Sequence, residues 1–378
     1  MRLFFYEIRK IFSWKLLLLI VFVNILLYKM LIEFDLEHFP NGRPAGDHFD
    51  IEQQIIPMFG AEWDENDLLK LQELYEKEVA EADAYLANDP EAVALGMDSY
   101  EKFNNFEQNN REQRAYFDKM YFQSESGFPW RLQSYEWYLF ENQHTGEAIV
   151  AYMTEASEGQ KKRLQQLLDE RQFAVYSDIV TMNFKTYKTS VAIVIFICIA
   201  ILISPIFIRD KISNIVPLQY TSTKGRTVYR TKWLAGLFSG TFLTTILLIL
   251  YMALYATNNT QSHFDLPLSS FGWYYHWYDL TFWQYIVLSV AVIFGLSVIL
   301  TILSMAISTV VPNRIVLIGV QIVVVFLMIA VGANFVVQHV INLWYSQLFV
   351  PGVIGGFTLL TLLLMLYVWK LEMQKDIM

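Results

Sequence analysis

The sequence predicts an all-α membrane protein with six transmembrane helices and a large helical extracytoplasmic insert between the first and the second. Three observations support this fold class. Only 17% of the 378 residues are charged and 54% are hydrophobic, whereas soluble domains carry about 25% charged residues. Six stretches are long and apolar enough to span a bilayer, which takes roughly 20 residues. Basic residues gather in alternate short loops, the pattern that sets orientation in a membrane.

The first predicted span, residues 14–32, is the weakest of the six. Its core without charged residues is only Leu16–Tyr28, and Lys29 follows. A cleaved signal peptide would need a small-residue cleavage site after this segment; no such site follows, so a retained span is the preferred interpretation. The other five predicted spans make up a transmembrane region over 189–378, at residues 189–208, 233–256, 282–311, 315–337 and 349–369.

In the short loops and the termini, lysine and arginine residues fall on one side of these predicted spans. The alternate short loops, 257–281 and 338–348, contain neither residue. The positive-inside rule therefore predicts that both termini are cytoplasmic. The bases of the opposite loops and termini are Arg2, Arg9, Lys10, Lys15, Arg209, Lys211, Lys224, Arg226, Arg230, Lys232, Arg314, Lys370 and Lys375.

The long segment 33–188 is then predicted to be an extracytoplasmic helical domain. It holds 31 of the 37 acidic and 14 of the 28 basic residues, a net charge of −17, which leaves +8 for the rest of the chain. Acids left outside are the ordinary counterpart of bases kept inside. The alternative interpretation is a surface that attracts cationic ligands.

Within this domain the sequence predicts loop up to residue 60, where Gly and Pro are concentrated. Residues 62–88 lack both and carry an apolar stripe at helical spacing, which predicts a helix that Asp89-Pro90 ends. A second helix is expected around 98–123, followed by a shorter aromatic segment after Pro129. From about residue 160 we expect one unbroken helix into the second span, with a kink at 189–191.

No catalytic or metal-binding motif occurs in the sequence. It lacks G-x-S-x-G, H-E-x-x-H and paired-cysteine spacings, and the single Cys198 excludes an intrachain disulfide. His38, Asp47, His48 and Asp50 lie near one another without regular spacing, so solvated side chains are the preferred interpretation and no metal is expected. The chain also lacks a Walker A sequence. We therefore expect neither an enzyme nor a cofactor bound by this chain.

Spans two to six, as predicted, carry no ionisable residue in their cores. Ion-coupled transporters usually need such groups, so uphill transport would take its energy from a partner. The loop 257–281 is rich in aromatic residues, which is typical of a belt at the membrane interface. Lining of an exit route for an amphipathic substrate, by Trp273, Tyr274, Trp277 and Tyr278, is the alternative.

Two segments on the predicted cytoplasmic side carry the functional hypothesis. Residues 1–13 form an amphipathic helix with Arg2, Arg9 and Lys10 on its polar face, as in helices that lie in the headgroup plane. Residues 209–232 combine a leucine, hydroxyls and bases at a length that fits a short helix and turn. Such a loop can insert into a groove of a soluble partner. Thr221 or Ser222 can cap a helix start, and Gly225 permits a left-handed turn.

This loop resembles that of ABC-2-type permeases, the membrane subunits of ATP-binding-cassette exporters. Asp210 stands where the family usually has Glu, and Asn214 where it usually has Gly. The amphipathic N-terminal helix, the insert after the first span and the six spans fit the same family. The matching residues are Asp210, Ser213-Asn214, Leu218, Thr221-Ser222-Thr223-Lys224-Gly225-Arg226 and Lys232.

The resemblance implies an ABC exporter permease in a bacterial cytoplasmic membrane. It implies a homodimer, or a heterodimer with a sister permease, docked on nucleotide-binding subunits that hold ATP and Mg, and contact with membrane lipid; no nucleic acid is expected. An amphipathic or peptide-like substrate, such as an antimicrobial peptide or a drug, is expected, with sodium or a lipid-linked precursor as alternatives. The rival function is a membrane-anchored sensor or envelope-binding protein. The residues expected to couple to the ATPase are Asp210, Leu218, Thr221, Ser222, Lys224, Gly225, Arg226 and Lys232.

Overall fold

The structure is a computed structural model that describes residues 2–170, 175–222, 225–272 and 275–374. Within these residues the regular structure is helical, and pairing between extended segments is limited to two isolated bridges, Tyr176 with Phe271 and Pro267 with Thr281. The predicted all-α class is therefore confirmed. The chain divides into two compact units. We call Met1–Glu37, Met182–Thr260 and Trp283–Met378 the bundle unit, and His38–Thr181 with Gln261–Phe282 the insert unit.

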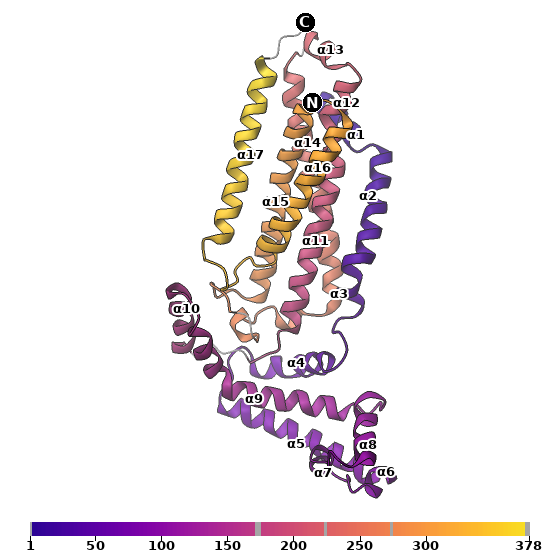
Figure 1. Cartoon of the computed structure of the whole chain (residues 1–378), viewed down its shortest axis with the longest axis vertical. Helices are drawn as coiled ribbons and strands as arrows, with labels where there is room; N and C mark the ends of the chain where they lie inside the picture. Colours follow the sequence, from indigo (N-terminus) through magenta and orange to yellow (C-terminus); the bar gives the residue numbers. More distant parts are fainter. Residues whose placement is uncertain (1, 171–174, 223–224, 273–274, 375–378) are drawn as a thin grey trace. The chain divides into compact units, whose positions relative to one another are not determined.

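Six helices among the described residues are long and apolar enough to cross a membrane, and they overlap all six predicted spans (Figure 1). They indicate a multi-pass membrane protein. In order they are α2 (Trp14–Leu27) with η1 (Tyr28–Ile32) and α3 (Glu33–Glu37), α11 (Ile179–Ile203) with α12 (Pro205–Ile212), α14 (Thr227–Tyr255), α15 (Phe282–Val310), α16 (Arg314–Leu327) with η5 (Met328–Val337), and α17 (Phe349–Gln374).

The helix α11 forms the centre of the bundle unit. Its apolar window is 78% buried, whereas the windows of the first and last spans are each 11% buried. The helix is interrupted after α11 because Pro205 has no N–H group to continue the series of backbone hydrogen bonds. Residues 189–191, where the sequence predicts a kink, lie within the continuous helix α11.

Mild polar groups and small residues join the helices of this unit. Asn24 of α2 donates to Cys198 Sγ of α11 at 3.0 Å and accepts from Tyr251 Oη of α14 at 3.1 Å. On α14, a Cβ added to Gly240 would collide with the side chain of Thr301 on α15. Hydrogen bonds and close approach of this kind hold helices together where both lipid and side chains are apolar.

Lys188 corrects the prediction that spans two to six lack ionisable residues. The helix α11 begins at Ile179, so Lys188 lies inside it and is fully buried. Its Nζ donates to Tyr285 Oη at 2.6 Å and to Ser289 Oγ at 3.1 Å, both on α15. The sequence analysis started this span at residue 189 because the apolar run starts there, whereas the helix starts earlier.

The insert unit is a set of helices with its own hydrophobic core. A capping box at Asp64 starts its second helix, and Asp89 ends that helix as predicted. The core joins α5 to α9 through buried residues such as Leu86, Phe103 and Leu132. The helices are α4 (Ala45–Phe59), α5 (Glu65–Asn88), α6 (Pro90–Ala94), α7 (Tyr100–Asn104), α8 (Arg111–Phe122), α9 (Phe128–Met153) and α10 (Glu158–Asp169), with short turns η3 (Gln261–His263) and η4 (Leu268–Ser270).

Two predictions for the insert unit are wrong. Residues up to 60 are not loop throughout: Gly and Pro occupy the turn before α4, and α4 then buries apolar residues such as Ile51 and Ile55. The helix predicted from 160 is also interrupted, because α10 ends at Asp169 and residues 175–178 are not helical. The backbone N–H groups of Val175 and Tyr176 donate to Ser270 O, so these residues pair with a distant segment instead of continuing a helix.

Two further elements differ in length from their predictions. The helix expected around 98–123 is divided into α7 and α8 by residues 105–110. The aromatic segment after Pro129 is not short: α9 extends over 26 residues. Pro129 lies in the first turn of α9, where a missing N–H costs no intrahelical hydrogen bond, so it favours the start of this helix.

Candidate functional site

The candidate site of the bundle unit is built around the buried carboxylate of Asp210, at the end of α12. Lys10 of α1 (Arg2–Ile11) and Lys232 of α14 both form ion pairs with it. Gln219 of α13 (Val216–Thr221) donates from Nε2 to Asp210 Oδ2 at 2.8 Å and accepts from Lys232 Nζ at 3.0 Å. We call these four residues the hub. Four helices therefore meet at one carboxylate that is 1% exposed.

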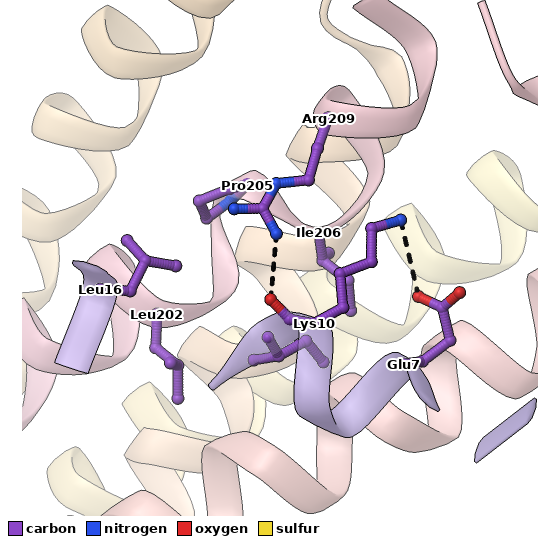
Figure 2. Close-up of a pocket in the computed structure, with 8 residues that line it drawn as sticks. Glu7, Lys10, Leu16, Leu202, Pro205, Ile206 and Arg209 are labelled. Carbon is purple, nitrogen blue, oxygen red and sulfur yellow. Dashed lines mark hydrogen bonds and ion pairs between the residues drawn. The ribbon is translucent and has the colours of Figure 1, made fainter. Parts of the chain in front are cut away.

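The hub carries a second acid at its edge. Glu7 of α1 is 3% exposed, and its Oε2 lies 4.0 Å from Lys10 Nζ. Burial raises the pKa of Glu7 above its usual range, and the nearby charges of Lys10 and Lys232 partly oppose that shift. Figure 2 shows Lys10 directed toward Glu7, while Arg209 of α12 donates to the Lys10 carbonyl oxygen at 3.0 Å. The connection between α1 and α12 thus uses side chains of both helices.

Other bonds fix the same loop to α15 and α17. Lys211 Nζ donates to Thr309 O at 2.7 Å and to Val311 O at 3.0 Å. A lysine in this position caps the C-terminal carbonyls of a helix and neutralises its negative end. Tyr220 Oη donates to Glu372 Oε1 at 2.5 Å. The loop after the second span is therefore held by five other parts of the bundle unit: α1, α14, α15, α17 and the segment after α15.

The turn between α12 and α13 is left-handed at Asn214. Asn214 has a φ of 52°, and the N–H groups of Asn214 and Ile215 donate to Lys211 O and Asp210 O. This is the Schellman arrangement, whose left-handed position usually holds Gly and sometimes Asn. Asn214 therefore performs the conformational role of the glycine expected there. Gly225 also has a positive φ, 50°, as predicted for a left-handed turn.

The hydroxyls of the loop do not cap a helix start, contrary to prediction. Thr221 Oγ1 donates back to Pro217 O at 3.1 Å, and Ser222 Oγ donates to Gln219 O at 2.6 Å. Both hydroxyls therefore satisfy carbonyls at the end of α13. The residue before α14 is Arg226, which has no side-chain capping bond. Lys224 lies outside the described residues.

The same loop exposes apolar side chains beside its buried hub. Leu218 is 70% exposed, Ile212 is 43% exposed and Ile215 is 39% exposed. We call these three residues the loop surface. Exposed apolar groups gathered in a short segment mark a surface for another protein or for a membrane. The predicted coupling residues thus fall into two sets: Asp210 and Lys232 lie inside the unit, and Leu218 is accessible.

The N-terminal helix has the predicted amphipathic form, but its bases do not act alike. Arg2 and Arg9 are exposed, whereas Lys10 belongs to the hub. The opposite face of α1 packs on α14, with Phe4 lying 5.9 Å from Phe238 and Phe12 lying 6.0 Å from Phe242, between ring centroids. Sequence periodicity placed Lys10 on the polar face without revealing that an acid 200 residues away pairs with it.

The aromatic loop 257–281 belongs largely to the insert unit. Trp273 and Tyr274 lie outside the described residues. Trp277 is half-buried next to Gly159 of α10, and Tyr278 is 44% exposed. Arg163 of α10 donates to His276 O at 3.2 Å and pairs with Asp279. The segment is thus held against α10 by a charge pair as well as by its rings.

Glu52, His263 and Tyr138 form a buried polar network in the insert unit that no sequence motif indicates. Glu52 accepts from Tyr138 Oη at 2.9 Å and from the backbone N–H of Ser177 at 2.6 Å, and its Oε2 lies 3.0 Å from His263 Nε2. All three side chains are fully buried. The network joins α4, α9, residue 177 and the turn at 261–263, so its evident role is to fix these segments.

The histidine and aspartate group of the N-terminal insert does not converge. Among the described residues, no cluster of His, Cys, Asp and Glu is arranged to hold a metal ion. His48 is not solvated as expected: it is 9% exposed, and its ring packs edge-on against Trp137 and Tyr138 at 5.0 and 5.2 Å. Burial lowers the pKa of His48, while the charge of Glu52 opposes the shift.

Replacement of Asp210 by Asn tests the hub. The change leaves Lys10 and Lys232 without their counter-charge, and losing one partner of a buried ion pair costs about 3–5 kcal/mol. We expect a correspondingly lower free energy of unfolding, measured by denaturation in detergent. Glu33→Gln is the control, because its partner Lys29 is 62% exposed and such pairs contribute under about 1 kcal/mol. Equal effects of the two substitutions would contradict a structural role for the hub.

Acidification tests the burial of His48. Its lowered folded-state pKa means that the unfolded chain binds more protons just below the ordinary pKa of about 6.5, so stability falls as the pH drops through that range. Asp47 nearby has a raised pKa, caused by burial, and acts in the opposite direction at lower pH. We expect the thermal midpoint to decline between pH 7.5 and 5.5, and His48→Phe to decline less. Identical slopes would show that His48 is not buried.

Comparison with known proteins identifies no relative from which a function could be transferred. No protein-family model, curated protein or solved structure matches the chain. The function is therefore inferred from the hub, from the loop surface beside it and from the sequence motif that contains the loop surface and every hub residue except Lys10.

Proposed function

We propose that this chain is the permease subunit of an ABC exporter in a bacterial cytoplasmic membrane. The subunit moves an amphipathic or peptide-like substrate outward, and a partner subunit that holds ATP and Mg hydrolyses the ATP. The observation that supports this most is the combination of the loop surface with the hub. An accessible apolar segment is fixed, through Asp210, to helices on both sides of it in the sequence.

The hub explains how a partner could drive the spans. A nucleotide-binding subunit that binds Leu218 applies force to α13. Gln219, the next residue, transmits this force to Asp210 through its hydrogen bond. Asp210 lies on α12, directly after the central helix α11, and its two lysines lie on α1 and α14. A ligand shifts a conformational equilibrium only by binding two states with different affinity. If the nucleotide state of the partner changes its affinity for this loop, it supplies the difference in affinity between the two conformations.

The proposed orientation follows from the charges. With the loop after α12 in the cytoplasm, both termini are cytoplasmic and the insert unit is extracytoplasmic. Its excess of acidic residues would attract a cationic substrate such as an antimicrobial peptide. The permease would function as a homodimer or with a sister permease, because the resemblance implies two nucleotide-binding subunits.

A membrane-anchored sensor is the second candidate. The insert unit has its own hydrophobic core and folds from two separate parts of the chain, which suits a domain that binds envelope components. A sensor, however, has no need for a loop that exposes leucine while its base is clamped by buried ion pairs. The two functions therefore differ in whether the loop surface contacts an ATPase.

Leu218→Glu separates the two candidates. The side chain is 70% exposed, so we expect the protein to keep its thermal midpoint while ATP hydrolysis stimulated by the permease falls at least about ten-fold, since a charge would face an apolar groove. The assay uses the full chain co-purified with the ATPase encoded beside it. Leu371→Glu, an equally drastic change at another exposed leucine on α17, is the control. Arg226→Glu extends the test to the basic end of the loop. Unchanged stimulation in both loop variants would favour the sensor.

Cysteine labelling in intact cells tests the orientation. The single native thiol, Cys198, is fully buried, so a cysteine introduced on the surface dominates the signal. We expect Leu218→Cys to resist a membrane-impermeant maleimide until the cells are opened. Glu81→Cys, at an exposed position of α5, should react at once. Labelling of Leu218→Cys from outside would invert the topology and refute the proposed coupling.

A further inference from the structure

A long apolar groove opens on the bundle unit between α16 and the pair α11 and α12, with α2 as its third side. Its volume is about 730 Å³. Ile318 and Ile322 line it from α16, and Ile197 and Ile201 line it from α11. We call it the α16 groove. Because its walls are membrane-spanning helices, the molecule that fills it must be largely apolar.

The groove is long enough for an acyl chain. Its lining residues on α16 and η5 recur every three or four positions from Arg314 to Ile329, so they form one continuous stripe on that helix. At 1.5 Å per residue this stripe is about 22 Å long. One leaflet of hydrocarbon is about 15 Å thick, half of the bilayer core. A lipid tail therefore fits within the groove along its whole length.

Two arginines distinguish this groove from an ordinary crevice between helices. Arg314, the first residue of α16, is exposed, and Arg209 of α12 is half-buried, with one Nη group donating to Lys10 O. No acidic residue is among the described residues that line the groove. A guanidinium has five donors and binds phosphate well. Positive charge beside a long apolar groove is complementary to an amphiphile with an anionic head.

We propose that the α16 groove is a binding site for an anionic phospholipid, with its acyl chains along the stripe of α16 and its phosphate held by Arg209 and Arg314. Basic pockets between membrane helices select anionic headgroups in this way. Because Arg209 also bonds to Lys10, a bound headgroup would lie next to the hub. The site does not depend on the transport function proposed above and can be tested on this chain alone.

The test is lipid titration of the purified full-length protein, followed by native mass spectrometry. Phosphatidylglycerol and phosphatidylcholine with identical acyl chains are compared. We expect phosphatidylglycerol to bind more tightly, and Arg314→Gln to weaken it about five-fold without changing phosphatidylcholine binding, the effect of one basic side chain at a lipid surface. Lys370→Gln, at an exposed lysine of α17 that does not line the groove, should bind as the wild type does. Ile322→Trp should weaken the binding of both lipids, because the larger side chain would fill part of the α16 groove.

Three results would overturn the proposal. The first is equal binding of the two phospholipids by the wild type. The second is an equal loss in the Arg314→Gln and Lys370→Gln variants, which would show a general effect of charge instead of a site. The third is a lipid-free dimer that becomes monomeric in the Ile322→Trp variant, which would show that a second copy of the chain covers the groove.

Discussion

Charges that are removed from water must keep their partners, and this constraint governs the bundle unit. Asp210 is almost fully enclosed, and its carboxylate accepts hydrogen bonds from two lysines and from one side-chain amide. Breaking such a contact exposes an uncompensated charge to an apolar interior, so α1, α12, α13 and α14 cannot separate at this point without a large cost. The helices therefore respond to a force on the loop as a connected body. Other contacts, such as that of Tyr220 with Glu372, extend the connection to α17.

The membrane-spanning helices were predictable because the bilayer imposes a rule on each segment separately. A span must pair its own backbone groups and must be apolar over a fixed length, and both properties can be read locally. The insert unit follows no such rule. The extended residues Val175 and Tyr176, before α11, donate their backbone N–H groups to Ser270 O, about 95 positions away. The absence of Gly and Pro is compatible with a helix there, but it does not reveal that Ser270 O competes for the backbone N–H groups.

The candidate site shows the same division. Asp210 and Lys232 could be singled out through the resemblance to a family loop, and the left-handed turn at Gly225 follows from its residue type. Lys10 could not be assigned to this site, because its contact with Asp210 spans 200 positions. Glu52 and His263 are 211 positions apart, and neither belongs to a motif. A single sequence does not indicate such pairs, because each of these residues, taken alone, would be predicted to be exposed to solvent.

The insert unit draws its last segment, Gln261–Phe282, from beyond the third membrane-spanning helix. His263, which closes the contact with Glu52, is therefore synthesised only after α2, α11 and α14. Until the ribosome has passed α14, the carboxylate of Glu52 lacks its imidazole neighbour. The interior of the insert unit therefore becomes complete only after three helices of the bundle unit have been synthesised.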